Sequence, residues 1–208
     1  MGAAFAPYAA PVYERCTSIV HKSLLQYQAY QQNPETDEPD KSFLVVALDL
    51  LSGLTQGLGM ALETLIANGQ PNLVQLLTVC LKHPQAPVRQ SAYALVGDMA
   101  MHCFPLLKPH TPAIMHELIE QLDPEPKVEF VSACNNAAWS VGEIALRYGR
   151  GKPSSCLLDD SISCALQTTP SSVSGSSPSS RVWCLFSSTR RHRVAFTRTP
   201  RSPLVVSA

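Results

Sequence analysis

Apolar residues recur at helical spacing through the first 150 residues of the chain. From Val12 to Gln32 they follow i, i+4, i+7 and i+8, and the same period returns in later stretches. Segments rich in Pro, Gly or acidic residues interrupt the pattern, such as NPETDEPD at 33–40 and HPQAP at 83–87. The pattern predicts an all-α fold with helices over residues 12–32, 41–58, 60–67, 73–82, 88–103, 111–122 and 126–149, and it predicts a Pro-punctuated connector over 104–110.

Each predicted helix has an apolar face that we expect to lie in the core. For the segment 41–58 this face holds Phe43, Val46, Ala47, Leu50, Leu54 and Leu58, and the opposite face holds Val45, Asp49, Ser52 and Gln56. For 88–103 the predicted inward positions are Val88, Ala92, Leu95, Met99 and Cys103. Gln90, Ala94, Gly97 and Met101 lie on the other side, with Asp98 at the border.

The segment 126–149, PKVEFVSACNNAAWSVGEIALRYG, carries its largest side chain on its polar face. At about 100° per residue, its apolar stripe consists of Phe130, Cys134, Ala137, Val141, Ile144, Ala145 and Tyr148. Trp139 falls opposite this stripe, in line with Asn135 and Glu143. A tryptophan there is either covered by another part of the chain or available to a partner, and the pattern leaves both alternatives open.

The helices repeat at a fixed distance along the chain. Gly53, Gly97 and Gly142 stand 44 and 45 residues apart, and the last two share the pattern A-x-x-x-V-G-acid-hydrophobic-A. A period of about 40–47 residues built from two helices is typical of HEAT and armadillo arrays. We therefore expect an α-solenoid of about three and a half HEAT repeats.

Charge divides the chain into two parts. Residues 1–150 hold 9 Lys and Arg against 14 Asp and Glu, whereas residues 151–208 hold 7 against 2 and are rich in Ser and Pro. A segment of the second composition buries too little apolar surface to offset the loss of chain entropy. We predict a solenoid over 1–150 and a disordered Ser/Pro/Arg-rich tail over 151–208, which limited proteolysis should trim back towards Arg150.

The cysteines and the N-terminus suggest a reducing compartment. The seven cysteines form no C-x-x-C pair, the first residues lack a basic signal-peptide region, and no uninterrupted apolar run reaches the roughly 18 residues that span a bilayer. The expected location is the cytoplasm and nucleus, without a membrane partner.

Four blocks of sequence resemble the C-terminal part of the transportin family, the karyopherin-β nuclear import receptors for cargo with proline-tyrosine localisation signals. They are APYAAPVYERC (6–16), DKSFLVVALDLLSGLTQGLG (40–59), VRQSAYALVGDM (88–99) and SACNNAAWSVGEIA (132–145). The resemblance covers about residues 5–149. It implies a non-enzymatic module whose second helices line a concave surface that holds the cargo signal as an extended chain.

The resemblance also implies which residues contact cargo. The family's contact positions map onto Val45, Asp49, Gln56, Gln90, Asp98, Asn135 and Trp139. Carboxylates and amides suit an extended peptide because they bind its backbone and its basic side chains, and Trp provides an apolar platform. Gln56 stands where many relatives have glutamate, which removes one negative charge. The family's Ran-type GTPase contact lies in N-terminal repeats that this chain lacks, and nuclear pore proteins are further partners that the resemblance suggests.

Other chemistry has little support in the sequence. GRGKPS (149–154) departs from a P-loop at Leu146 and Pro153, and the histidines and cysteines show no metal spacing. We expect no catalytic residues, metal or cofactor.

From Gly151 the family pattern stops, and the tail contains the basic stretch TRRHRVAFTRTPR. Three alternatives to a cargo receptor therefore stay open: a HEAT scaffold with another function, a nonfunctional truncated splice product, and an RNA binder that uses the basic tail. Direct nucleic-acid binding is not the expected function.

Overall fold

A computed structural model describes residues 3–33, 35 and 37–148 of the chain. The described part is all-α, as the periodicity predicts. The predicted tail, 151–208, lies outside the described residues. The elements are η1 (Ala3–Phe5), α1 (Ala6–Gln32), α2 (Lys41–Leu58), η2 (Gly59–Leu62), α3 (Glu63–Asn68), α4 (Leu73–Cys80), α5 (Ala86–His102), α6 (Phe104–Leu107), η3 (Lys108–His110), α7 (Thr111–Glu120), η4 (Val128–Phe130) and α8 (Val131–Tyr148).

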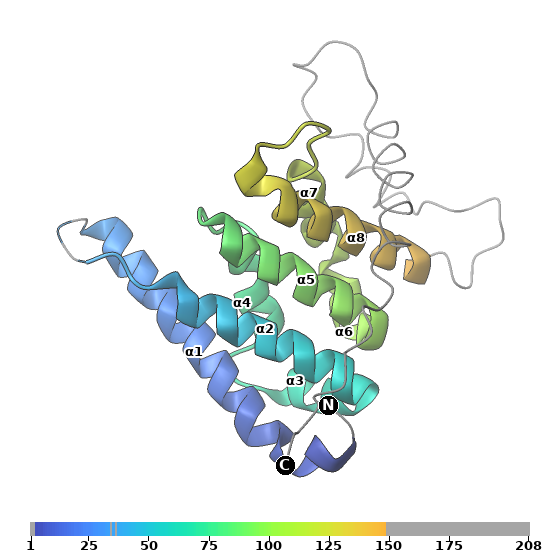
Figure 1. Ribbon diagram of the computed structural model, residues 1–208. Coiled ribbons are helices and arrows are strands. Elements are labelled where there is room, and N and C mark those ends of the chain that lie inside the picture. The colour runs from blue at the N-terminus through green and yellow to red at the C-terminus, as the bar shows by residue number, and fades with distance from the viewer. Residues whose placement is uncertain (1–2, 34, 36, 149–208) are drawn as a thin grey trace, which may run out of the picture.

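The helices form two layers in a solenoid (Figure 1). Helices α2, α5 and α8 lie side by side in one layer, and α3, α4, α6 and α7 lie behind them, while α1 packs along α2. Three helical units follow one another, α1 with α2, α3–α4 with α5, and α6–α7 with α8. We call the exposed side of the first layer, away from α3, α4, α6 and α7, the α2–α5–α8 face.

Several helix ends follow from local chemistry. The Asp40 side chain caps α2 by accepting a hydrogen bond from the Ser42 N–H at 2.8 Å, and Asn72 caps α4 in the same way through the Gln75 N–H at 3.1 Å. Gly59 follows α2 with φ +55°, a left-handed conformation that suits glycine.

Some helix boundaries differ from the predicted ones. The first helix begins at Ala6 rather than at Val12 and contains Pro11. Helix α4 begins at Leu73 as predicted, after the Asn72 cap and Pro71. Residues 104–110 are helical, as α6 and η3, since a proline in the first turn is compatible with a helix. Helix η3 runs directly into α7, which begins at Thr111, and the Thr111 hydroxyl donates to the Leu107 carbonyl at 3.1 Å.

The core lies between the two layers and runs along the whole described part. All five inward positions predicted for α5 are buried, from Val88 to Cys103. On α2, however, the buried residues are Leu44, Ala47, Leu48, Leu51, Ser52, Leu54 and Thr55. Phe43, Val46 and Leu50, which we placed in the core, are exposed, because α2 is apolar on most sides and only its neighbours decide which side is covered.

On α8 the predicted stripe is mostly right, with two exceptions. Ala145 is exposed, and Glu143 is buried, where its carboxylate pairs with the Arg147 guanidinium at 2.9 Å. An acid one turn before an arginine can be buried because the positive charge of the arginine compensates the negative charge of the acid.

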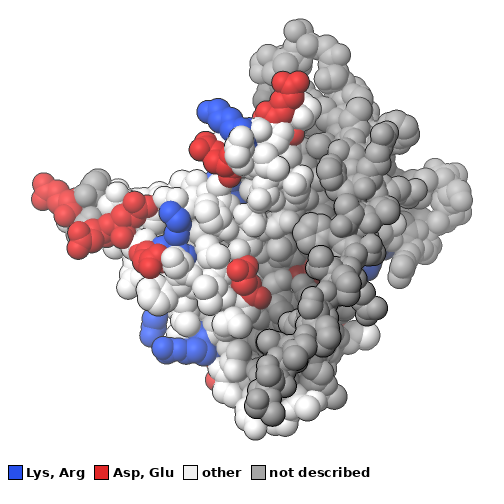
Figure 2. All heavy atoms as spheres, viewed as in Figure 1, with Lys and Arg blue, Asp and Glu red and all other residues white. Residues whose placement is uncertain are grey.

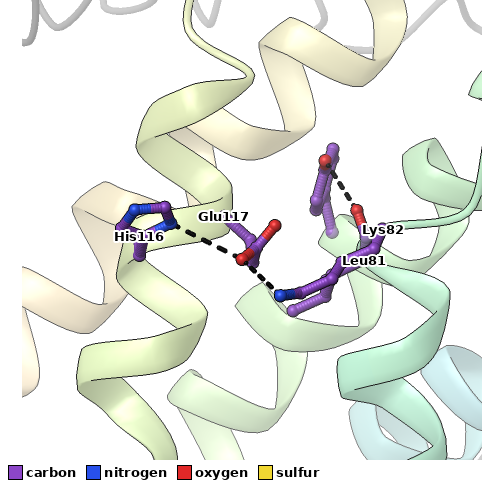
Figure 3. Close-up of polar contacts among 5 residues, drawn as sticks. Leu81, Lys82, His116 and Glu117 are labelled. Carbon is purple, nitrogen blue, oxygen red and sulfur yellow. Dashed lines mark hydrogen bonds and ion pairs between the residues drawn. The ribbon is translucent and has the colours of Figure 1, made fainter. Parts of the chain in front are cut away.

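The second layer is held partly by polar contacts between α4 and α7. Figure 3 shows Lys82, in the turn after α4, and His116 both directed at Glu117 of α7; the Lys82 ammonium lies 2.9 Å from the Glu117 carboxylate.

By length and composition alone the stretch Lys41–Asn68 could cross a membrane. Core packing accounts for only part of its apolar character: Leu44, Leu48, Leu51 and Leu54 are buried, whereas Phe43, Val46 and Leu50 are exposed.

Candidate functional site

The residues predicted to bind a ligand come from the three helices of the first layer. Val45, Asp49 and Gln56 lie on α2, Gln90 and Asp98 on α5, and Asn135 and Trp139 on α8. These helices are neighbours in the order α2, α5, α8 (Figure 1). The structure therefore gathers on adjacent helices residues that are up to 94 positions apart in the sequence.

On α2, the three predicted residues differ in exposure. Asp49 and Gln56 are exposed, as expected for a ligand surface. Val45 is only half-exposed and packs against the core, so its assignment to a non-core face was partly wrong. Asp49 is one turn from Val45 and shares its side of the helix.

Asp98 is the centre of a small polar cluster between α2 and α5. Its side chain is buried, and its Oδ2 accepts a hydrogen bond from the Ser52 hydroxyl and another from the Gln56 amide at 3.0 Å. Among the described residues no cation lies within ion-pair distance of this carboxylate. The sequence pattern placed Asp98 only at the border of the exposed side; the two donors from α2 explain how a charged group is buried there.

Trp139 lies against the backbone of α5. A Cβ atom added to Gly97 would come within 2.2 Å of the Trp139 Cζ3 atom, so the ring covers the glycine directly. Trp139 as a whole is partly exposed. Of the two alternatives that the sequence left open, cover by another part of the chain therefore holds in part, and contact with a partner stays a prediction.

Two of the predicted residues, one on α5 and one on α8, carry amide side chains. Gln90 on α5 and Asn135 on α8 are exposed, and the next residue, Asn136, donates to the Gln90 carbonyl at 2.9 Å. Deeper between the same helices, the Ser140 hydroxyl donates to the Tyr93 carbonyl. These two bonds fix α8 against α5 along the length that carries Gln90, Asn135 and Trp139.

Sequence reasoning missed the apolar part of this surface. The exposed fractions are 66% for Phe43, 56% for Val46 and 40% for Leu50, and Leu146 on α8 is exposed as well. Met101 on α5 is exposed at its predicted outward position. The signal that could have revealed this surface is the apolar composition of α2 on most of its sides, which is more than one core-facing side requires. Most of the visible part of the α2–α5–α8 face is uncharged; charged side chains lie mainly at its left and upper margins, and some acidic atoms lie near its middle (Figure 2).

The described residues offer little for metal or acid–base chemistry. They contain no group of three or more His, Cys, Asp or Glu side chains that could hold a metal ion. The shifted thiols belong to the core: burial raises the pKa of Cys80 to about 12, and burial, aided by the Glu63 carboxylate, raises that of Cys103 to about 11. Neither thiol is suited to nucleophilic chemistry near neutral pH.

No protein-family model matches the chain. Curated proteins do match, at substantial identity. The chain is 44% identical over 146 residues to Transportin-1 of Mus musculus, an alignment that covers 70% of this chain and 16% of that protein. The resemblance to the transportin family is confirmed.

Two further relatives support it. Importin subunit beta-2 of Schizosaccharomyces pombe is 42% identical over 146 residues, with the same coverage of both chains. Transportin-1 of Oryza sativa subsp. japonica is 38% identical over 152 residues, which covers 72% of this chain and 16% of the rice protein. This chain thus spans about one sixth of the length of the curated relatives that it matches.

Proposed function

We propose that this chain is part of a nuclear import receptor that binds proline-tyrosine localisation signals along its α2–α5–α8 face, and that it shuttles between cytoplasm and nucleus. The names of the relatives, transportin and importin, support the import role. The contact residues are Val45, Asp49, Gln56, Gln90, Asp98, Asn135 and Trp139. The proposal is of a binding protein without catalysis.

The observation that carries the proposal is the row of exposed amides, one exposed acid and a half-exposed Trp on three adjacent helices. An extended peptide exposes its backbone N–H and C=O groups, which the Gln90 and Asn135 amides can bind. Asp49 can pair with a basic side chain, and the accessible side of Trp139 offers apolar area. Trp is also enriched among the residues that dominate binding energy at interfaces.

Asp98 is buried in the unbound chain, and its first contribution to binding is its negative charge. Its carboxylate is buried and held by Ser52 and Gln56, so a basic group approaching Gln56 would meet a negative charge just below the surface. Because charges separated by protein interior are screened less than those in water, this acid supports binding of a basic ligand.

Binding of a labelled peptide with a basic stretch followed by Pro-Tyr tests the proposal. Trp139→Ala should weaken binding by about 2 kcal/mol, roughly thirtyfold. Since Trp139 also packs on Gly97, Asn135→Ala provides a second variant on an exposed side chain that should weaken binding without a change in melting temperature. Glu120→Ala, an exposed acid on α7 in the other layer, is the matched control and should bind as the wild type does.

A folded chain that fails to bind such peptides would favour the alternative of a HEAT scaffold with another function. Loss of the helical circular-dichroism signal in the purified chain would favour the nonfunctional truncation. Salt-dependent RNA binding that disappears with the tail arginines would favour the RNA-binding alternative.

A further inference from the structure

One side of α2 is exposed along most of its length and is apolar. With 3.6 residues per turn, Phe43, Val46 and Leu50 lie about 120° around the helix from Ser52 and Gln56, which point at α5. Asp49 lies between the two groups. We call Phe43, Val46, Asp49 and Leu50 the α2 strip.

Beside the α2 strip, the backbone of α2 is uncovered at Gly53. Gly53 lies on the same side, one turn beyond Asp49, and a Cβ atom placed there would have no neighbour within 4 Å. Single exposed apolar residues are ordinary, but three on one side of one helix, beside an acid and an open glycine, mark a surface that fits another chain. A suitable ligand combines apolar and basic side chains.

The chain itself contains a segment with this chemistry. Residues 190–201, RRHRVAFTRTPR, contain five arginines, one histidine and no acid, with Val-Ala-Phe in the middle. Residues 1–150 carry a net charge of −5 (9 basic, 14 acidic), and residues 151–208 carry +5 (7 basic, 2 acidic). The two parts are therefore complementary in both charge and apolar content.

We propose that residues 190–201 dock on the α2 strip of the same chain and compete there with external basic peptides. The competition rests on the proposed function, because the α2 strip shares Asp49 with the proposed signal-binding surface. The exposed Asp49 carboxylate and the buried Asp98 carboxylate supply negative charge for the arginines, and the exposed Val46 and Leu50 supply apolar surface for the Val-Ala-Phe stretch. The tail thereby regulates access to the receptor surface.

The tail is long enough for this contact. About 40 residues connect the end of α8 to Arg190, and a flexible chain of that length has a root-mean-square span of roughly 35 Å. Two steps of about 10 Å between packed helices and the length of α2 require a similar distance. Tethering gives an effective concentration of about 1 mM, so a segment with an intrinsic Kd of about 100 µM would weaken external binding about tenfold.

The first experiment measures peptide binding to the full chain by fluorescence anisotropy, with the basic Pro-Tyr peptide as the probe. One variant replaces Arg190, Arg191, Arg193, Arg198 and Arg201 with Gln. The matched control replaces Lys152 and Arg181, which lie outside the docking segment. The five-residue variant should bind the probe about tenfold more tightly than the wild type, and the control should bind within twofold of it.

The second experiment does not depend on an external ligand. Trypsin cleavage after the arginines of 190–201 is followed by mass spectrometry in the wild type, in Asp49→Lys and in the control Glu120→Lys. Asp49→Lys should speed this cleavage several-fold, whereas Glu120→Lys should not. The rates should not change over a hundredfold dilution, because the contact lies within one chain.

The outcomes separate this inference from the proposed function. Equal probe affinity of the wild type and the five-residue variant, together with equal cleavage rates in all three chains, overturns the docking and leaves the receptor role intact. Slower cleavage that depends on Asp49 without any probe binding supports the docking while contradicting the receptor role. Cleavage rates that rise on dilution assign the contact to a second copy of the chain and overturn docking within one chain.

Discussion

At the scale of single residues, the contact between Trp139 and Gly97 sets how closely α8 approaches α5. The ring occupies the space that any Cβ atom at position 97 would need. The glycine therefore acts by its lack of a side chain rather than by an unusual backbone angle. Such close packing makes both residues sensitive to volume, because protein interiors leave few voids.

Gly97→Ala should lower the free energy of unfolding by about 1–3 kcal/mol, since the added methyl group overlaps the ring of Trp139. Urea denaturation followed by circular dichroism measures this. In a Trp139→Ala background the same substitution should cost much less, so a double-mutant cycle gives a coupling of similar size. The control is Gly53→Ala, where the space is open and alanine should stabilise the helix by about 0.5–1 kcal/mol. Additive effects would contradict the contact.

Gln56 holds the buried Asp98 carboxylate with its amide. Gln56→Glu replaces this donor with a second carboxylate, and we expect it to cost about 2 kcal/mol of stability at pH 7, the typical value of a hydrogen bond to a charged group. Binding of a basic peptide should become tighter at low salt and more salt-dependent, because the surface gains a negative charge. The control is Gln90→Glu, which adds the same charge at an exposed position of α5. Gln90 holds no buried carboxylate in the described part of the chain, so this substitution should leave the melting temperature unchanged.

At the scale of elements, the loop after α1 and the turn after α4 meet around His83. The imidazole is buried, its ring centroid lies 4.4 Å from that of Tyr27 on α1, and its Nδ1 accepts a hydrogen bond from the Gln85 N–H at 3.2 Å. The Gln85 side chain donates to the Glu38 carboxylate at 2.8 Å. Burial, and secondly the nearby Arg89 cation, lower the pKa of His83, while Glu38 opposes them.

This lowered pKa predicts a pH-dependent stability. Because the unfolded chain binds a proton on His83 at a higher pH than the folded chain does, stability is lost as pH falls below the ordinary histidine pKa of about 6.5. The melting temperature should decrease between pH 7.5 and 5.5. His83→Asn keeps an acceptor for the Gln85 N–H and should reduce this decrease; the same slope in both proteins would show that other groups cause it.

At the scale of the whole molecule, four cysteines lie in the two-layer core: Cys16, Cys80, Cys103 and Cys134. They contribute as small apolar residues, consistent with the raised pKa values of Cys16, Cys80 and Cys103. The other three, at 156, 164 and 184, fall in the predicted tail, outside the described residues.

Alkylation with iodoacetamide at pH 8 should therefore occur in two phases. The three tail thiols should react within minutes, and the four core thiols should react only at the rate at which the solenoid opens, which mild urea should increase. Mass spectrometry of tryptic peptides assigns each phase to its residues. Rapid reaction of Cys80 would contradict the packing described here, and protection of all seven thiols would contradict the prediction of a disordered tail.

The disorder of the tail and the division at residue 150 stay predictions, as do the seven ligand contacts. Local pattern was enough to place the helices and the inward face of α5, because Val88, Ala92 and Leu95 contrast with polar neighbours. It failed for α2, where Leu44 and Leu48 are as apolar as Phe43 and Val46 and no contrast marks the core side. It also failed for Asp98, whose donors Ser52 and Gln56 are more than 40 residues away.

The sequence by itself determined the all-α class, the period of 44 and 45 residues and most helix boundaries, because hydrophobic spacing, prolines and glycines act over a few neighbouring residues. Only the tertiary structure decided which side of α2 is exposed, why Gly97 must lack a side chain, and how Asp98 is buried. Those features depend on which helices become neighbours. A periodic pattern gives the direction of a side chain around its own helix, but not the identity of the surface that it meets.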